Sequence, residues 1–231
     1  MGIALLIIFM FLAYGLTTLF RRWIDIPTLI AVAIGCAVNA NIFNPITAPI
    51  VMGPFTFSIE IVLYTLFMYT LVVRTLDYGY KDAKRMALTS AAAIIISAII
   101  ELMANLMTKG FAEQTFKDFS IYLFSSVGTI AGAWVMIWIA KRCREKNISD
   151  YLIIPFAIIA STIIHSVFFY GGRALVNWEI GVYTAYDALG TVIGKAICIG
   201  LSILCYFINK KFWPPLNLIE KADANSDNKN N

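Results

Sequence analysis

Polar and apolar positions divide the chain into seven long apolar runs separated by short polar segments. Each run is long enough to cross a hydrocarbon layer of about 30 Å as a helix that rises about 1.5 Å per residue. Helices are expected because open strands would leave backbone polar groups unsatisfied in lipid. The pattern predicts an all-α polytopic bundle of seven transmembrane spans. The runs cover about 2–20, 26–43, 55–74, 86–107, 119–140, 151–170 and 184–208.

The second run has the weakest pattern. Pro27 opens it, which the first turn of a helix tolerates, and the segment "NANIFNPITAP" (39–49) closes it as a loop or re-entrant piece. If this run does not cross the membrane, the bundle has six spans.

Composition agrees with a membrane protein. Hydrophobic residues make up 60% of the 231 residues and charged residues 14%, which is more apolar than a water-soluble domain of this size can be. No polar insertion is long enough for a second core, so residues 1–211 are expected to form a single transmembrane domain. Residues 212–231 follow as an interfacial anchor, Phe212 and Trp213, and a disordered cytoplasmic tail.

Lysine and arginine gather in alternate polar segments, and the segments between carry only Lys109, Lys117 and Arg173. By the positive-inside rule the basic segments are cytoplasmic, which places the amino terminus outside and the carboxyl terminus inside the plasma membrane. The net charge of +4 therefore indicates orientation, and no nucleic-acid partner is expected. The basic segments contain Arg21, Arg22, Arg74, Lys81, Lys84, Arg85, Lys141, Arg142, Arg144, Lys146, Lys210 and Lys211.

The sequence lacks the motifs of catalysis and cofactor binding. Its four cysteines are scattered without a CxxC pair and it has one histidine, so neither a metal site nor a cofactor is expected. It has no nucleophile elbow and no HExxH, so we expect no enzymatic activity. It also has no GxxxxGK[ST], so any ATP-driven step would belong to an energising ATPase or coupling subunit.

Six polar residues share one depth when residues are counted from the cytoplasmic end of each helix, roughly 20 to 24 Å above that boundary. They are Asn39, Glu60, Glu101, Ser126, His165 and Lys195. Charges at such depth cost about 3 kcal/mol each on insertion scales, so they should face the bundle interior and pair. The match predicts a substrate cavity open to the outside. Its predicted lining is Asn39, Asn41, Glu60, Tyr64, Glu101, Asn105, His165, Asp187 and Lys195.

Structural roles stay open for the same residues. Lys195 lies in the outer half of the membrane, so its side chain could extend to the outer surface. Glu60 and Glu101 could form an ion pair with Lys195 and bind nothing else. His165 could be a hydrogen-bonded packing residue.

Small residues repeat at four-residue spacing, which lets helices approach closely. Gly128 and Gly132 form one such pair and Gly190 and Gly194 another. Ala83, Ala87 and Ala91 repeat in the same way. We expect these faces to pack within the bundle, and docking of another membrane protein is the alternative.

Four segments together are similar to one known family. They are "NANIFNP" (39–45), "YGYKDAKR" (78–85), "STIIHSVFFYGG" (161–172) and "TVIGKAICIGLSILCYFINKK" (191–211). They resemble the VUT family of vitamin-uptake and queuosine-precursor transporters, and Lys195 matches that family's membrane lysine. The chain departs from the family at or near Val72, Leu76, His165 and Ser202, where the family has acidic residues.

The resemblance implies a substrate-uptake fold, similar to the substrate-binding components of energy-coupling-factor transporters. We therefore expect an uptake transporter or substrate-capture subunit for a small polar or aromatic solute, vitamin-like or a 7-deazapurine queuosine precursor. Tyr64 and Trp134 are expected to be its stacking walls. The alternative is a non-transporting subunit of a larger complex, whose basic segments 77–85 and 141–146 contact a cytoplasmic partner or anionic lipid. A homo-oligomer is left open.

Overall fold

The computed structural model describes residues 8, 12, 34–35, 50–52, 55–57, 59–111, 113–177 and 182–212. Of the first two predicted spans it describes Ile8, Leu12, Ile34 and Gly35, all helical. The choice between seven and six spans therefore falls outside the described residues, as does the predicted tail beyond Phe212.

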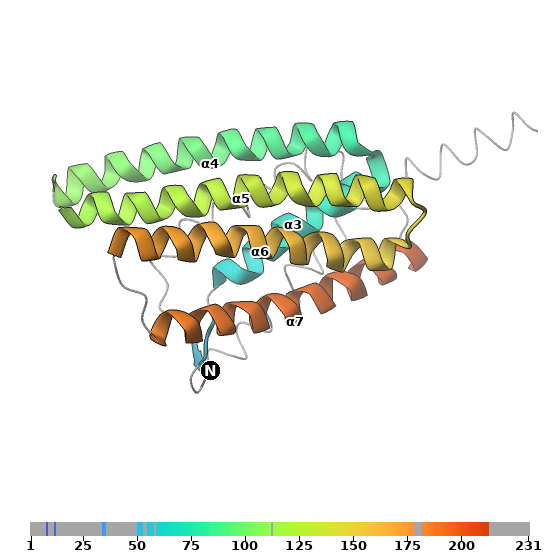
Figure 1. Ribbon diagram of the computed structural model, residues 1–231. Helices are drawn as coiled ribbons and strands as arrows, with labels where there is room; N and C mark the ends of the chain where they lie inside the picture. Colours follow the sequence, from blue (N-terminus) through green and yellow to red (C-terminus); the bar gives the residue numbers. More distant parts are fainter. Residues whose placement is uncertain are drawn as a thin grey trace, which may run out of the picture.

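Five long helices account for nearly all of the described chain (Figure 1). Each is long and apolar enough to cross a membrane. They match the third to seventh predicted runs but extend further at most ends, so fewer residues remain between consecutive helices than the sequence predicted. The helices are α3 (Ile59–Tyr78), α4 (Tyr80–Lys109), α5 (Glu113–Glu145), α6 (Asp150–Asn177) and α7 (Val182–Phe212).

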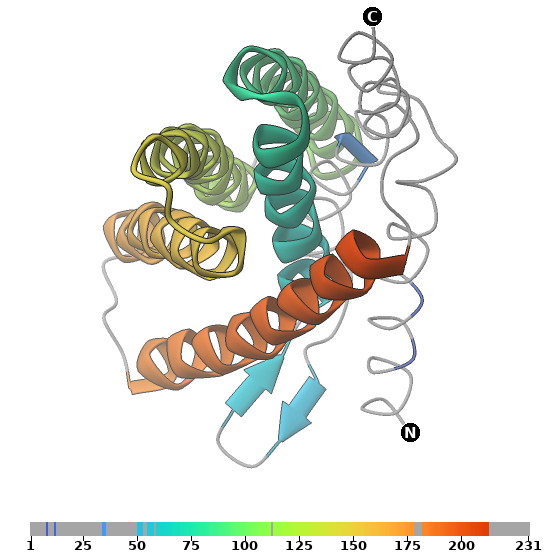
Figure 2. The ribbon, with the colours of Figure 1, turned by 90° about the vertical axis from the view of Figure 1, so that its right-hand side faces the viewer.

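A short antiparallel hairpin precedes α3 and corrects the prediction of a helix beginning at residue 55. Strand β1 (Ile50–Met52) pairs with β2 (Phe55–Phe57), with Val51 opposite Thr56. These residues are mostly β-branched or aromatic, which favours strands. Strand β2 contacts α7 (Figure 2). Over the described residues, the fold is thus helical apart from this hairpin.

Helix α3 occupies the centre of the described bundle. In Figure 1, helices α4, α5, α6 and α7 form a row from top to bottom in that order, and α3 lies behind α5 and α6. The view along the bundle shows α3 between α7 and the other three (Figure 2). It contacts all four, and every side chain from 61 to 76 is buried. Side chains on α3 can therefore meet residues from each of the later helices.

The outer faces of the row are apolar. Ile96 and Ile100 of α4 are 58% and 63% exposed, and Phe156 and Val167 of α6 are 62% and 64% exposed. Continuous apolar surface of this kind is not tolerated in water, whereas lipid chains solvate it well. Together with the helix lengths, it indicates a membrane-embedded protein.

Glycine brings α5 and α6 into close contact. A Cβ on Gly132 would lie 2.7 Å from Ser161 Oγ, and one on Gly128 would lie 2.8 Å from Phe168 Cβ. The Gly128 and Gly132 pair therefore packs within the bundle, as predicted. This close approach also brings the polar residues of α6 up to α3.

The segment predicted as a loop after the third span is almost entirely helical. Gly79 alone separates α3 from α4, and its φ of 93° is a conformation that glycine adopts far more readily than other residues. The residues from Tyr80 to Arg85 form the first turns of α4.

Candidate functional site

Three of the predicted site residues, Tyr64, His165 and Lys195, meet in the interior of the bundle, and we call them the Tyr64 cluster. Lys195 on α7 places its Nζ 3.5 Å from Nδ1 of His165 on α6 and 4.6 Å from the centre of the Tyr64 ring on α3. The rings of Tyr64 and His165 are in contact, with centroids 4.3 Å apart. An ammonium group in an apolar interior requires such electron-rich neighbours, and an aromatic face and an imidazole lone pair both supply them.

The ring of His165 connects three helices. Its Nδ1 lies 3.5 Å from Lys195 Nζ on α7, and a lysine ammonium there would donate a hydrogen bond to it. Its Nε2 lies 3.4 Å from Oγ of Ser125 on α5, within hydrogen-bond distance. The imidazole thus links α7 to α5 through α6. Phe169, one turn along α6, stacks parallel to it at 6.0 Å.

The hydroxyl of Tyr64 fixes the ring in place. It lies 3.1 Å from Ser161 Oγ and donates to the Ser161 backbone oxygen at 3.3 Å. Ser161 in turn donates to the sulfur of Met68 at 3.1 Å. Gly132 leaves the space for this arrangement, because a Cβ there would lie 3.1 Å from the Tyr64 hydroxyl.

Further hydroxyl groups near this level have no hydrogen-bond partner among the residues that the structure describes. They belong to Ser126 on α5 and to Thr162 and Ser166 on α6, each adjacent in sequence to a residue of the cluster. Buried hydroxyl groups are normally satisfied, so unsatisfied ones near a buried cation are candidates for binding a polar solute.

The remaining predicted lining residues are not placed in this cluster by the described contacts. Glu101 and Asn105 lie on α4, where Glu101 is near Tyr122 of α5, whose hydroxyl donates to Ser97. Glu60 lies at the start of α3 and Asp187 in α7, and their side chains fall outside the described part of the structure. Asn39 and Asn41 also lie outside the described residues.

Two expectations about the cavity need correction. Tyr64, His165 and Lys195 are 4%, 7% and 3% exposed, so the cluster is closed rather than open to the outside. Trp134, expected as a second aromatic wall, lies instead below the Lys84 ammonium, 5.5 Å from its ring centre. It belongs to the end of the bundle where α4 begins.

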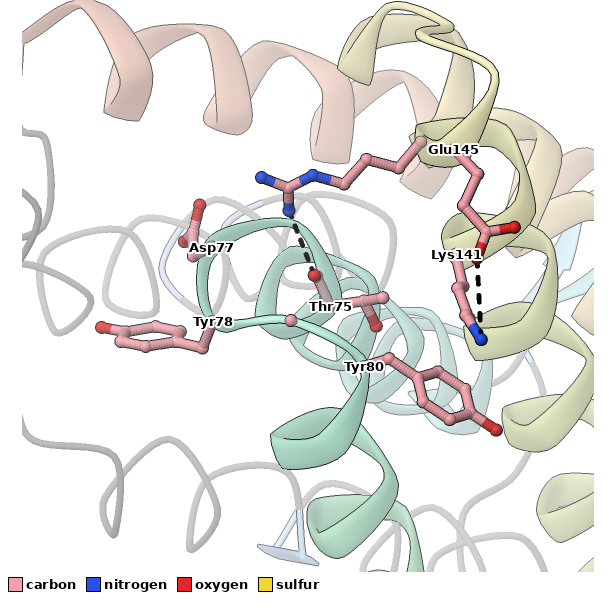
Figure 3. Close-up of a pocket in the computed structure, with 8 residues that line it drawn as sticks. Thr75, Asp77, Tyr78, Tyr80, Lys141 and Glu145 are labelled. Carbon is pink, nitrogen blue, oxygen red and sulfur yellow. Dashed lines mark hydrogen bonds and ion pairs between the residues drawn. The ribbon is translucent and has the colours of Figure 1, made fainter.

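A pocket that the sequence did not indicate lies at that end, where α3 meets α4 and α5 (Figure 3). Its volume is about 430 Å³. Arg144 reaches across it to the last carbonyls of α3, those of Thr75 and Leu76, and Lys141 pairs with Glu145 at 3.6 Å. The lining is Thr75, Asp77, Tyr78, Gly79, Tyr80, Lys141, Arg144 and Glu145.

The charges of this pocket serve mainly the bundle itself. Arg144 caps the carboxyl end of α3, where cations are favourable. Nearby, Arg74 is 1% exposed, with its guanidinium 4.0 Å from the Tyr78 ring centre and 3.9 Å from Asp82. The Tyr64 cluster is about 16 Å further along α3, at 1.5 Å per residue from Thr75, so the two sites are separate.

The Tyr64 cluster offers one lysine amine, one imidazole, a phenol ring and several hydroxyls. Such groups suit binding a small polar or aromatic molecule. Within the described residues, no three side chains of His, Cys, Asp or Glu come together as a metal site.

Comparisons of the chain with protein-family models, with curated proteins and with solved structures find no match. The resemblance to the VUT family therefore stays a prediction from the sequence.

Proposed function

We propose that this protein is a plasma-membrane uptake transporter, or the substrate-capture subunit of one, for a small polar or aromatic solute. A vitamin-like molecule or a 7-deazapurine is the solute class that the resemblance favours. The lipid bilayer is its environment, and an energising subunit would supply any ATP-driven step.

The observation that supports this proposal best is the position of Lys195. Its Nζ lies beside His165 Nδ1 and the Tyr64 ring, deep in a bundle whose outer faces are apolar. Polar and ionisable groups inside a membrane are expensive and commonly mark a solute or ion pathway. The Tyr64 and His165 rings offer stacking surfaces, and the hydroxyl groups of Ser126, Thr162 and Ser166 offer hydrogen bonds.

The closed cluster would be one state of a transport cycle. Solute entry requires Tyr64, His165 and Lys195 to separate, and these residues lie on three different helices. Movement of α7 relative to α3 and α6 would open the cluster, because the ammonium contacts both of those helices.

The test is uptake of radiolabelled purines, 7-deazapurines and vitamins by cells that express the protein or its Lys195→Met variant. Methionine keeps much of the length and apolar volume of the lysine stem but removes the charge. We expect uptake of one solute class by the unmodified protein, and its loss in Lys195→Met at equal membrane abundance. Lys117→Met, a partly exposed cation on α5 near the far end of the bundle, is the matched control and should retain uptake.

Normal accumulation in Lys195→Met would refute a role of the ammonium in binding. Loss of uptake in both variants would point to a general defect in folding or membrane insertion.

A non-transporting membrane subunit is the second candidate. The close mutual contacts of Tyr64, His165, Ser125 and Lys195 favour it, because they would equally well lock α3, α5, α6 and α7 together. In that case Lys195→Met would lower the unfolding temperature of the purified protein, while no solute would raise it in the unmodified protein.

A further inference from the structure

Cationic side chains crowd the end of the bundle that contains Gly79, and they outnumber the carboxylates there. The same end joins the close of α3, α5 and α7 to the start of α4 and α6, as the contacts of Arg144 with Leu76 and of Lys210 with Asp150 show. Its cations are Arg74, Lys81, Lys84, Arg85, Lys141, Arg142, Arg144, Lys146, Lys210 and Lys211, and its carboxylates are Asp77, Asp82, Glu145 and Asp150.

Two of these cations stand over a pair of tryptophans on the outer face of α4 and α5. Lys84 of α4 lies 5.5 Å from the Trp134 ring centre, and Arg142 of α5 lies 5.9 Å from that of Trp138. Trp134 and Trp138 are four residues apart, so the two indoles are neighbours on one face of α5. Trp138 is 54% exposed and therefore faces the surroundings of the bundle.

The charge of this face is not balanced by its own carboxylates. Arg142 pairs with Glu145 at 3.3 Å and Arg85 approaches Asp82 at 4.0 Å. Lys81 and Lys84, both exposed, form no ion pair in the structure as described. An anion that approaches Trp134 and Trp138 would thus meet uncompensated positive charge from α4.

An apolar strip continues from these residues toward the other end of the bundle. It is formed by Leu88 and Ile95 of α4 and by Val127 and Leu123 of α5, which are 41% to 51% exposed. The two helices run side by side over this length, as the bond between Tyr122 and Ser97 and Figure 1 show. Cations, interfacial indoles and an apolar strip in that order match the phosphate, the glycerol region and the acyl chains of a phospholipid.

We propose that this face of α4 and α5 is a binding site for an anionic phospholipid, with the lipid phosphate held between Lys84 and Arg142 above Trp134 and Trp138. Charge complementarity selects an anionic headgroup over a zwitterionic one. The inference does not depend on the transport function, because none of these residues belongs to the Tyr64 cluster.

The test uses the full-length protein in detergent, titrated with short-chain phosphatidylglycerol or phosphatidylcholine and observed by native mass spectrometry. We expect phosphatidylglycerol to bind more tightly than phosphatidylcholine. Each basic residue near a membrane surface contributes about fivefold in affinity, so Lys84→Gln with Arg142→Gln should weaken phosphatidylglycerol binding about tenfold or more. Lys84→Arg should keep it.

Lys146→Gln with Lys211→Gln is the matched control, since it removes two exposed cations of the same end that do not contact Trp134 or Trp138. Equal losses in the two double variants would overturn a specific site in favour of general surface charge. Equal binding of both lipids would also overturn it. Inorganic phosphate in excess should not displace the lipid, and displacement would show a free-anion site instead.

Unfolding temperatures in phosphatidylcholine nanodiscs separate lost binding from lost folding. They should agree between the unmodified protein and Lys84→Gln with Arg142→Gln. If the variant is unstable, Lys84→Gln alone should still lower the affinity, and unchanged affinity in a folded single variant would contradict the proposal.

Discussion

The ring and the hydroxyl of Tyr64 have separate roles. The ring faces the Lys195 ammonium and the His165 imidazole, whereas the hydroxyl bonds to Ser161 on α6. Tyr64→Phe should therefore lower stability by about 1 kcal/mol, the usual net value of a buried hydrogen bond, and leave solute binding largely intact. Tyr64→Leu removes the ring as well and should impair binding. Thermal unfolding in detergent and a ligand-induced shift of the unfolding temperature measure the two effects.

If Tyr64→Phe abolished solute binding at unchanged stability, the hydroxyl would itself contact the solute. The division of roles between ring and hydroxyl would then be wrong.

Gly79 allows the cost of its backbone conformation to be measured separately from any steric clash. A Cβ at this position has open space around it, so the cost of Gly79→Ala comes from its φ of 93° alone. We expect a loss of about 1–2 kcal/mol in unfolding free energy, measured as a lower unfolding temperature. Gly200→Ala, in helix α7 with equal space and an ordinary φ, should be neutral or slightly stabilising. Similar effects of both changes would show that a side chain at position 79 does not strain the backbone between α3 and α4.

Counting residues along each helix placed His165 and Lys195 at one depth, and the structure has them 3.5 Å apart. Depth alone did not identify which serine of α5 contacts the imidazole, because Ser125 and Ser126 differ by one residue in depth but by about 100° around the helix. Ser161 was missed for a related reason. Its hydroxyl becomes a site group only through Gly132 and Tyr64, which lie on other helices.

Most helices of the structure are longer than the apolar runs from which they were predicted. Helix α4 begins at Tyr80, six residues before the predicted run, because lysine and arginine are good helix formers whose charged ends can extend to the surface. The hairpin at residues 50–57 was missed because a short apolar run cannot distinguish a strand from a buried helix.

Packing between α5 and α6 predicts opposite results for two adjacent glycines. A Cβ on Gly172 would overlap Cγ of Phe124, whereas one on Gly171 meets nothing within 4 Å. Gly172→Ala should therefore destabilise the protein by about 1–3 kcal/mol through overpacking. Gly171→Ala should be neutral or slightly stabilising, since alanine favours the helix. Unfolding temperatures of the two purified variants test this directly.

Both substitutions add one methyl group to α6 at adjacent positions. Gly171→Ala therefore controls for any general effect of alanine in this helix. Equal temperatures would mean that Phe124 moves aside without cost and that α5 and α6 are not held as closely as the structure has them.

At the scale of the whole molecule, charge predicts orientation. The end with Lys146 should face the cytoplasm and the end with Glu113 should face outward. In a cysteine-free variant, Glu113→Cys should react with a membrane-impermeant maleimide in intact cells, and Lys146→Cys only after permeabilisation. Both positions are exposed, and the Glu113 ion pair with Lys117 contributes little at the surface. The reverse pattern would invert the orientation and place the basic end outside.

The central place of α3 affects how the protein is made. Ribosomes complete α3 before the four later helices that contact it, so those contacts form only after α3 has been made. In a chain that ends after residue 78, the side chains of α3 that face these helices would lack their final neighbours. We therefore expect the innermost helix to reach its final packing only once α7 has entered the membrane.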